Sequence, residues 1–149
     1  MDEPEGPVAR ECVEGYLFAR APIALLLFRR PPERGRIWVP VSGKVDPSDP
    51  GLEPALRREI AEETGLSVAG PLLPLDWHVK FRADNGEIWR LHAYGVEVPR
   101  TFVPRLSAEH EAAEWVDPAE ARRRLHYEDN RAAVDRLLER LGAAGSRNA

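Results

Sequence analysis

Three glutamates in one helical segment constrain this chain more than any other feature. Glu59, Glu62 and Glu63 stand at positions i, i+3 and i+4 of Gly51–Thr64, which is predicted to be a helix that ends at Gly65. At about 100° per residue, the three side chains share one arc of that helix, with Cβ atoms about 5–6 Å apart. Carboxylates this close repel one another, and a divalent cation would relieve the repulsion. The alternative is a solvated acidic helix face.

Apolar runs before and after this helix predict a single mixed domain of the α/β (α+β) class. Residues 1–12 are predicted to be a flexible N-terminal arm, residues 13–142 the domain, and residues 143–149 a frayed tail. The expected strands are Val13–Ala19, Ile23–Phe28, Ile37–Val41, Leu72–Phe81, Glu87–Val98 and Ala113–Val116, and the expected helices are Gly51–Thr64, Pro118–Leu125 and Asp129–Leu141. A loop is expected over Ser42–Pro50, which is rich in Gly, Pro, Asp and Ser, and a hairpin turn at Asp84–Gly86.

Composition excludes several classes of protein. With 149 residues and no apolar run near the roughly 20 residues of a membrane span, no membrane partner is expected. The net charge of -4 argues against a nucleic-acid partner, and the single cysteine, Cys12, excludes an intramolecular disulfide or a zinc site of several thiolates. The acidic, proline-rich N-terminus lacks the features of a signal peptide, so the expected location is cytoplasmic. Oxygen donors without clustered Cys or His favour Mg²⁺, with Mn²⁺ as a substitute.

The helix and the loop before it resemble the Nudix box, G-x5-E-x7-R-E-U-x-E-E-x-G-U, where U is a bulky aliphatic residue. Gly43 matches the first position, and Arg58-Glu59-Ile60-Ala61-Glu62-Glu63-Thr64-Gly65-Leu66 matches the last nine. The first half departs from the pattern, because the box glutamate falls on Asp49 and one extra residue separates it from Arg58. The resemblance implies a Nudix fold, a mixed β-sheet sandwiched between helices, over about Val13–Leu141.

The resemblance also implies roles for individual residues. Glu59, Glu62 and Glu63 match metal-binding glutamates, the carbonyl of Gly43 matches a further metal ligand, and Arg58 matches the arginine that orients a glutamate. The family cleaves a nucleoside diphosphate linked to another group. Water attacks phosphorus, metal ions offset the phosphate charge, and a carboxylate takes the proton of the water.

Two sources of that general base stay open. In some members of the family it is a box glutamate, such as Glu62 here, and in others it comes from a late loop before the last strand. Glu109 precedes His110 ahead of the predicted strand at Trp115, which is similar to the late-loop site. Glu109 is therefore the expected base and Glu111 the reserve, with an exposed acidic loop as the alternative.

Basic and aromatic residues indicate the kind of substrate. The candidates for phosphate binding are Arg29, Arg30, Lys44, Lys80, Arg82 and Arg90, each of which could instead be a solvated surface charge. Trp77 and Trp89 could stack on a base or belong to the core. The Val-Ser-Gly that ends at Gly43, the late Glu-His and Asn130-Arg131 are similar to dihydroneopterin triphosphate pyrophosphatases, and diadenosine polyphosphate hydrolases share the late Glu-His feature.

Together these features predict a Mg²⁺-dependent pyrophosphohydrolase that cleaves a nucleoside- or pterin-type triphosphate to a monophosphate and pyrophosphate. One alternative is a dinucleoside polyphosphate hydrolase. Another is a Nudix-fold binding module that does not hydrolyse, suggested by Asp49 and the extra residue after it. A decapping-type hydrolase of RNA lacks the expected basic excess. A homodimer could form through the acidic arm or through Ile23–Phe28.

Overall fold

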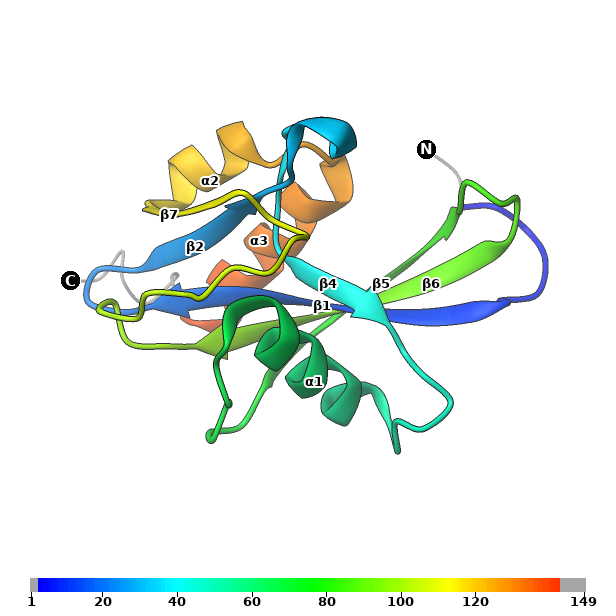
Figure 1. Ribbon diagram of the computed structural model, residues 1–149, viewed down its shortest axis with the longest axis horizontal. Coiled ribbons are helices and arrows are strands. Elements are labelled where there is room, and N and C mark those ends of the chain that lie inside the picture. The colour runs from blue at the N-terminus through cyan, green and yellow to red at the C-terminus, as the bar shows by residue number, and fades with distance from the viewer. Residues whose placement is uncertain (1–2, 143–149) are drawn as a thin grey trace.

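Seven strands form one mixed sheet that lies between helices on its two sides, as the sequence predicts (Figure 1). The computed structural model describes residues 3–142. The strands are β1 (Arg10–Ala19), β2 (Ala24–Arg29), β3 (Trp38–Val39), β4 (Val41–Lys44), β5 (Leu73–Arg82), β6 (Ile88–Glu97) and β7 (Ala112–Val116). The helices are α1 (Leu52–Thr64), α2 (Pro118–Arg124) and α3 (Glu128–Arg140), with a short 3₁₀ helix, η1, at Pro32–Arg34.

The side chains of β1 alternate between two hydrophobic cores, one on each face of the sheet. Leu17 packs in a core with Ile60 of α1, whereas Phe18 packs in a second core with Val134 and Leu137 of α3. Successive residues of a strand point to opposite faces, so a strand covered on both sides needs an almost continuous apolar run. This requirement explains the mostly apolar character of the predicted strands at β1 and β2, in which Glu14 is the one charged residue of Val13–Ala19.

One edge of β1 is shared by two different strands. β4 pairs with its first half, from Cys12 to Gly15, and β2 pairs with its second half, from Leu17 to Ala19. On the opposite edge, β6 runs parallel to β1 along nearly its whole length. The segment from β3 to β4 pairs first with β2 and then with β1. The change of partner falls at Pro40, which stands between β3 and β4 and has no N–H to donate.

The predicted boundaries therefore change at three places. The single strand expected at Ile37–Val41 is two strands, and the loop expected over Ser42–Pro50 begins only after Lys44, because β1 supplies hydrogen-bond partners to a segment of weak strand propensity. β1 begins at Arg10, since the first residues of the strand pair with β6. The predicted tail at residues 143–149 lies outside the described residues.

Both edges of β2 are occupied within the chain. β7 pairs along one side of it, and β1 and then β3 pair along the other. This strand therefore offers no edge to a second copy, although Ile23–Phe28 was one of the two segments expected to join a homodimer. None of the helices within residues 3–142 is both long and apolar enough to cross a membrane.

Replacing Leu137 with Ala should destabilise the fold, because this fully buried side chain of α3 fills the second core. The cost of such a deletion is about 2–5 kcal/mol of unfolding free energy. Urea denaturation followed by circular dichroism measures it, and Leu138→Ala, one residue further along the same helix and only half-buried, is the matched control. Equal losses from the two variants would contradict this assignment of the core.

Candidate active site

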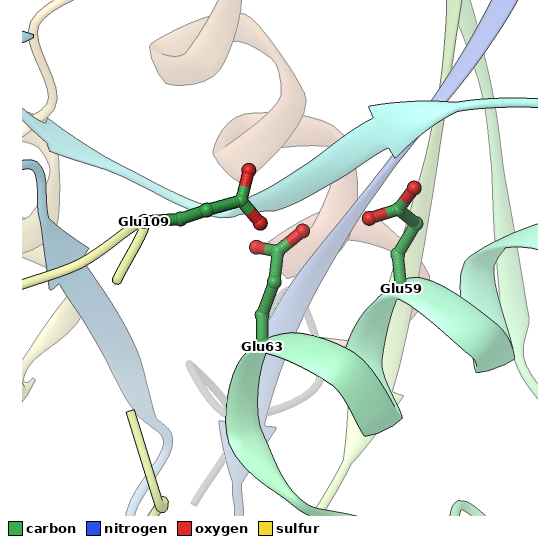
Figure 2. A group of neighbouring side chains, drawn as sticks. All are labelled: Glu59, Glu63 and Glu109. Carbon is green, nitrogen blue, oxygen red and sulfur yellow. The ribbon is translucent and has the colours of Figure 1, made fainter. Parts of the chain in front are cut away.

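Three carboxylates from two distant segments meet at one point of the molecule. Glu59 and Glu63 stand one turn apart on α1, and Glu109 reaches them from the loop before β7 (Figure 2). Each offers one carboxylate oxygen, and these three oxygens lie within 4.8 Å of one another. The structure therefore brings the late-loop glutamate expected from the sequence to the helix of the Nudix box.

The chemistry of this cluster suits a divalent cation. Burial raises the pKa of Glu63, and the neighbouring carboxylates Glu59 and Glu109 raise it further. Burial also raises the pKa of Glu59. Among the described residues, Glu63 Oε2 has no hydrogen-bond partner although it is buried. A buried carboxylate of this kind needs a proton or a cation, and an all-oxygen donor set fits Mg²⁺ or Mn²⁺.

Arg58 connects the loop before α1 to the carboxylates of the helix. Its Nε donates to Asp49 Oδ1 at 3.0 Å and its Nη2 to Asp49 Oδ2 at 2.8 Å, a bidentate pair. Its Nη1 donates to Glu59 Oε2 at 3.1 Å and to Glu62 at 3.3 Å. The hydrogen bonds from Arg58 hold the pKa of Asp49 below its usual value. Asp49 thus contacts the arginine of the box, despite the extra residue between them.

Glu62 is placed differently from the other two helix glutamates. Its side chain is 57% exposed and pairs with Arg58, and it is not one of the three residues whose oxygens converge. On an α-helix, Glu59 and Glu63 differ by about 40° around the axis, whereas Glu62 and Glu63 differ by about 100°. The three glutamates that the sequence places on one arc therefore face two ways. Glu59 and Glu63 point toward Glu109, whereas Glu62 points toward solvent.

Gly43 allows β4 to approach the cluster closely. A Cβ atom built at this position would overlap the carboxylate of Glu59, so a larger residue would displace that side chain. Only hydrogen fits between the backbone of β4 and the carboxylate. The geometry explains why a glycine stands here, and it brings the peptide backbone into the lining of the same cleft as Glu59 and Glu63.

The loop that carries Glu109 is anchored by its two following residues. The buried ring of His110 contacts Phe28 in a tilted arrangement, with 5.2 Å between centroids and 43° between the ring planes, and burial lowers the pKa of His110 to about 4. Glu111 pairs with Arg29 at 2.7 Å, and its backbone N–H donates to the carbonyl oxygen of Arg29. Glu111, the reserve candidate for the base, is therefore engaged with β2, whereas Glu109 faces the cluster.

A cleft of about 980 Å³ opens beside the carboxylates. Of the six predicted phosphate-binding residues, Arg30, Lys44 and Arg82 line this cleft, whereas Arg90 pairs with Glu11 outside its lining. Arg29 and Lys80 are not part of its lining, since Arg29 pairs with Glu111 and Lys80 lies on β5 beside the N-terminal arm, where its backbone N–H donates to Glu3.

The predicted Arg30 lines the cleft together with Arg34, which was not predicted. Arg30 follows β2 and Arg34 ends η1, so both come from the turn between β2 and β3. Arg34 stands in a Pro- and Gly-rich loop, where the spacing of residues does not predict which way a side chain points. Trp89 also lines the cleft, with Lys44 Nζ 5.0 Å from its ring centroid, while Trp77 lies under Arg136 outside it.

A buried polar group that also borders the cleft was not predicted from the sequence. The hydroxyl of Tyr16 donates to Glu14 Oε1 at 2.7 Å and accepts from Asn130 Nδ2 at 3.0 Å. Glu14 and Asn130 both belong to the lining of the cleft. Burial raises the pKa of Glu14 to about 8, so the carboxyl is mostly neutral at pH 7. Two signals were available, a charged residue inside the largely apolar strand β1 and the resemblance noted at Asn130-Arg131.

Replacing Gly43 with Ala should weaken metal binding, because the new methyl group must displace the carboxylate of Glu59. Disturbing the shell around a metal ligand costs about 10–100-fold in affinity. Calorimetric titration with Mn²⁺ measures the change. Gly70→Ala is the matched control, since a Cβ there meets nothing within 4 Å. Unchanged Mn²⁺ affinity in the Gly43 variant would place the metal elsewhere.

Replacing Glu14 with Gln should stabilise the protein more at pH 8 than at pH 5. The pKa of Glu14 is about 8 in the folded chain against 4.5 ordinarily, so between these values the folded state holds more protons and loses stability as the pH rises. The Gln variant lacks this loss. Urea denaturation of both proteins at each pH isolates the difference, because all other titrating groups are shared. A pH-independent difference would rule out a neutral Glu14.

The comparisons with known proteins agree with this geometry. The family model described as the NUDIX domain matches residues 16–137. The chain is 38% identical over 115 residues to an octanoyltransferase of Myxococcus xanthus, covering 75% of this chain and 31% of that protein. It is 30% identical over 105 residues to the asymmetrical bis(5'-nucleosyl)-tetraphosphatase of Rattus norvegicus, covering 65% of this chain and 67% of that protein. The chain therefore spans about a third of one relative and two thirds of the other.

Solved structures share the fold at low sequence identity. An Ap4A hydrolase of C. elegans superimposes with a TM-score of 0.76 at 19% identity, over 91% of this chain and 99% of that chain. The dihydroneopterin triphosphate pyrophosphohydrolase of E. coli gives a TM-score of 0.74 at 20% identity, over 87% and 96%. With the family model covering most of the domain and the box carboxylates meeting at one cleft, the chain belongs to the Nudix family of hydrolases.

Proposed function

We propose that this protein is a Mg²⁺-dependent pyrophosphohydrolase that cleaves a nucleoside- or pterin-type triphosphate to a monophosphate and pyrophosphate, with Mn²⁺ as a substitute for Mg²⁺. The observation that carries the proposal is the meeting of Glu59, Glu63 and Glu109 in one cleft. Nudix hydrolases act on phosphoric anhydride bonds, and this cleft combines a carboxylate cluster with basic side chains from other segments.

Some of these residues would bind the metal, and Glu109 would act on the attacking water. Glu59, Glu63 and the backbone of Gly43 would hold Mg²⁺, with Glu62 close enough on the helix to join when its side chain leaves Arg58. Bound there, the ion supplies positive charge that offsets the charge of the phosphates. Glu109 accepts the proton of the water that attacks phosphorus.

Four cationic side chains in the lining of the cleft suit the rest of a polyphosphate. Lys44, Arg30, Arg34 and Arg82 come from three separate segments of the chain, and all border the same space. Arg58 contributes indirectly, since its fork keeps Glu59 oriented and is itself held by Asp49. The volume of about 980 Å³ is at the upper end of small-molecule sites and admits a nucleotide-sized ligand.

A second candidate function is the asymmetric hydrolysis of dinucleoside polyphosphates. The observation that favours it is the 30% identity to the tetraphosphatase of Rattus norvegicus, which extends over two thirds of that protein. A panel of nucleoside triphosphates, dihydroneopterin triphosphate, diadenosine polyphosphates and nucleotide sugars, assayed with Mg²⁺ and with Mn²⁺, separates the two. Released pyrophosphate supports the first function, and release of a nucleoside triphosphate supports the second. Nucleotide binding without any product would support a module that does not hydrolyse.

Replacing Glu109 with Gln should lower kcat by about 10²–10⁴-fold, because the amide cannot accept the proton of the attacking water. Glu111→Gln is the matched control, two residues away and paired with Arg29, and it should keep kcat within a few-fold. Rates at saturating substrate and Mg²⁺ test both variants, with circular dichroism to confirm folding. The assignment of the base fails if Glu111→Gln loses as much activity as Glu109→Gln.

In the same assay Glu62→Gln tests the role of the third box glutamate. If Glu62 leaves Arg58 to join the metal, turnover should be abolished while the fold remains intact. Turnover that survives this change would show that the metal does not need Glu62 in addition to Glu59, Glu63 and the backbone of Gly43.

A further inference from the structure

We propose that His78 and His92 form a second metal site, which binds Zn²⁺ or a similar transition-metal ion through two imidazole nitrogens on the face of the sheet opposite the cleft. Neither histidine belongs to the lining of the cleft, so this site is independent of the proposed function. Oxygen ligands in the cleft would hold Mg²⁺, whereas imidazole ligands suit zinc, copper or nickel. The chain would thus bind two classes of metal ion at two places.

The pairing of three strands brings the side chains of this site together. His78 of β5 stands directly opposite His92 of β6, and β1 contributes Glu11 from the other side of β6. Leu91 and Cys12, the chain neighbours of His92 and Glu11, line the cleft. Since successive residues of a strand point to opposite faces, His92 and Glu11 point away from the cleft. The three strands extend past α1 (Figure 1), and here His78 is exposed and His92 half-buried.

Glu11 orients the imidazole ring of His92. His92 Nε2 lies 2.7 Å from Glu11 Oε1. Hydrogen bonds from Arg90 and His92 hold the pKa of Glu11 below its ordinary value, so its carboxylate is charged and can only accept. In the neutral ring of His92 the proton therefore stands on Nε2, and Nδ1 keeps a lone pair for a metal ion. Metal-binding histidines usually donate their other ring N–H in this way, often to a carboxylate.

The separation of the two rings suits ligands of one tetrahedral ion. The ring centroids of His78 and His92 lie 5.8 Å apart, and the ring planes make an angle of 41°. In a tetrahedral zinc site each nitrogen lies about 2.0–2.1 Å from the metal, which puts each ring centroid about 3 Å from it and two centroids about 5 Å apart. The observed separation is close to that value, and water molecules would complete the coordination of the ion.

Two basic residues near the histidines bear on the affinity of the site. Arg90 donates to both carboxylate oxygens of Glu11, at 3.1 Å and 2.7 Å, so the acid offsets its charge. Lys80 is paired with Arg90 across the two strands and stands two residues after His78. Both bases repel a cation, so replacing either of them should leave metal binding unchanged or strengthen it.

The test is calorimetric titration of the full chain with Zn²⁺ in saturating Mg²⁺, which occupies the carboxylates of the cleft. Zn²⁺ should bind to the unmodified protein, and His78→Gln and His92→Gln should each lose that binding. His126→Gln is the matched control, because this exposed histidine contacts the ring of Tyr127 instead of a second imidazole. Zn²⁺ binding that persists in both folded variants, or that Mg²⁺ abolishes in the unmodified protein, would overturn the proposal.

A pair of substitutions tests Glu11 as a positioning residue. Glu11→Gln should weaken Zn²⁺ binding by about 10–100-fold, because the carboxylate that orients the imidazole of His92 is lost. Arg90→Gln breaks the same ion pair but leaves Glu11 available to His92, so Zn²⁺ should bind to it at least as tightly as to the unmodified protein. Equal losses in the two variants would overturn the assignment of Glu11, since they would show that the ion pair acts only on the sheet.

Cu²⁺ is a spectroscopic probe of the same two nitrogens, because imidazole also suits this ion. Electron paramagnetic resonance should show coupling to two nitrogen ligands in the unmodified protein and to one in His78→Gln or His92→Gln. Spectra without this difference would overturn the proposal. Neither measurement requires hydrolysis, so an inactive protein could still confirm the site, and an active protein that binds no Zn²⁺ would overturn the site alone.

Discussion

The division of one edge of β1 between two strands is the constraint on which the site depends. β4 occupies the half from Cys12 to Gly15 and β2 the half from Leu17 to Ala19, so the chain must cross between them at Pro40. The crossing brings the backbone of β4 against α1, where only a glycine fits beside Glu59. It also leaves β2 free to pair with β7 on its other edge, and the loop before β7 carries Glu109 to the same place.

Acidic and basic residues are distributed unequally along the chain, and both kinds border the cleft. From Gly43 to Leu66 there are six acids and three bases, which contribute -3 of the net charge of -4. The buried carboxylates of this segment face a cleft whose rim carries Lys44, Arg30 and Arg34. In the proposed function a cation would bind to the carboxylates first, and a polyphosphate to the cation and these basic residues together. The net charge alone argues only against a nucleic-acid partner, whereas the position of the charges supports the proposed order of binding.

Much of the site could be predicted because it is local in the sequence. Helical periodicity placed Glu59 and Glu63 on one side of α1, and the resemblance of the late Glu-His to a family feature identified Glu109. The same periodicity could not predict that Glu63 is buried and Glu62 exposed, because it places both on one arc of the helix without showing which part of the arc faces solvent. Arg29 and Lys80 were expected in the cleft, but their facing directions are set by Glu111 and by strand pairing. Glu14 and Asn130 are 116 residues apart, and only the packing of α3 on the sheet unites them.

The contact between Asp49 and Arg58 has a consequence for how such motifs are interpreted. Aspartate is one methylene shorter than glutamate, and the loop that carries it is one residue longer than the family pattern. The longer loop nevertheless delivers the shorter acid to the guanidinium fork of Arg58, which donates two hydrogen bonds to it. In this chain an ion pair therefore ties the irregular half of the box to its regular half, a connection that counting residues along the motif does not reveal.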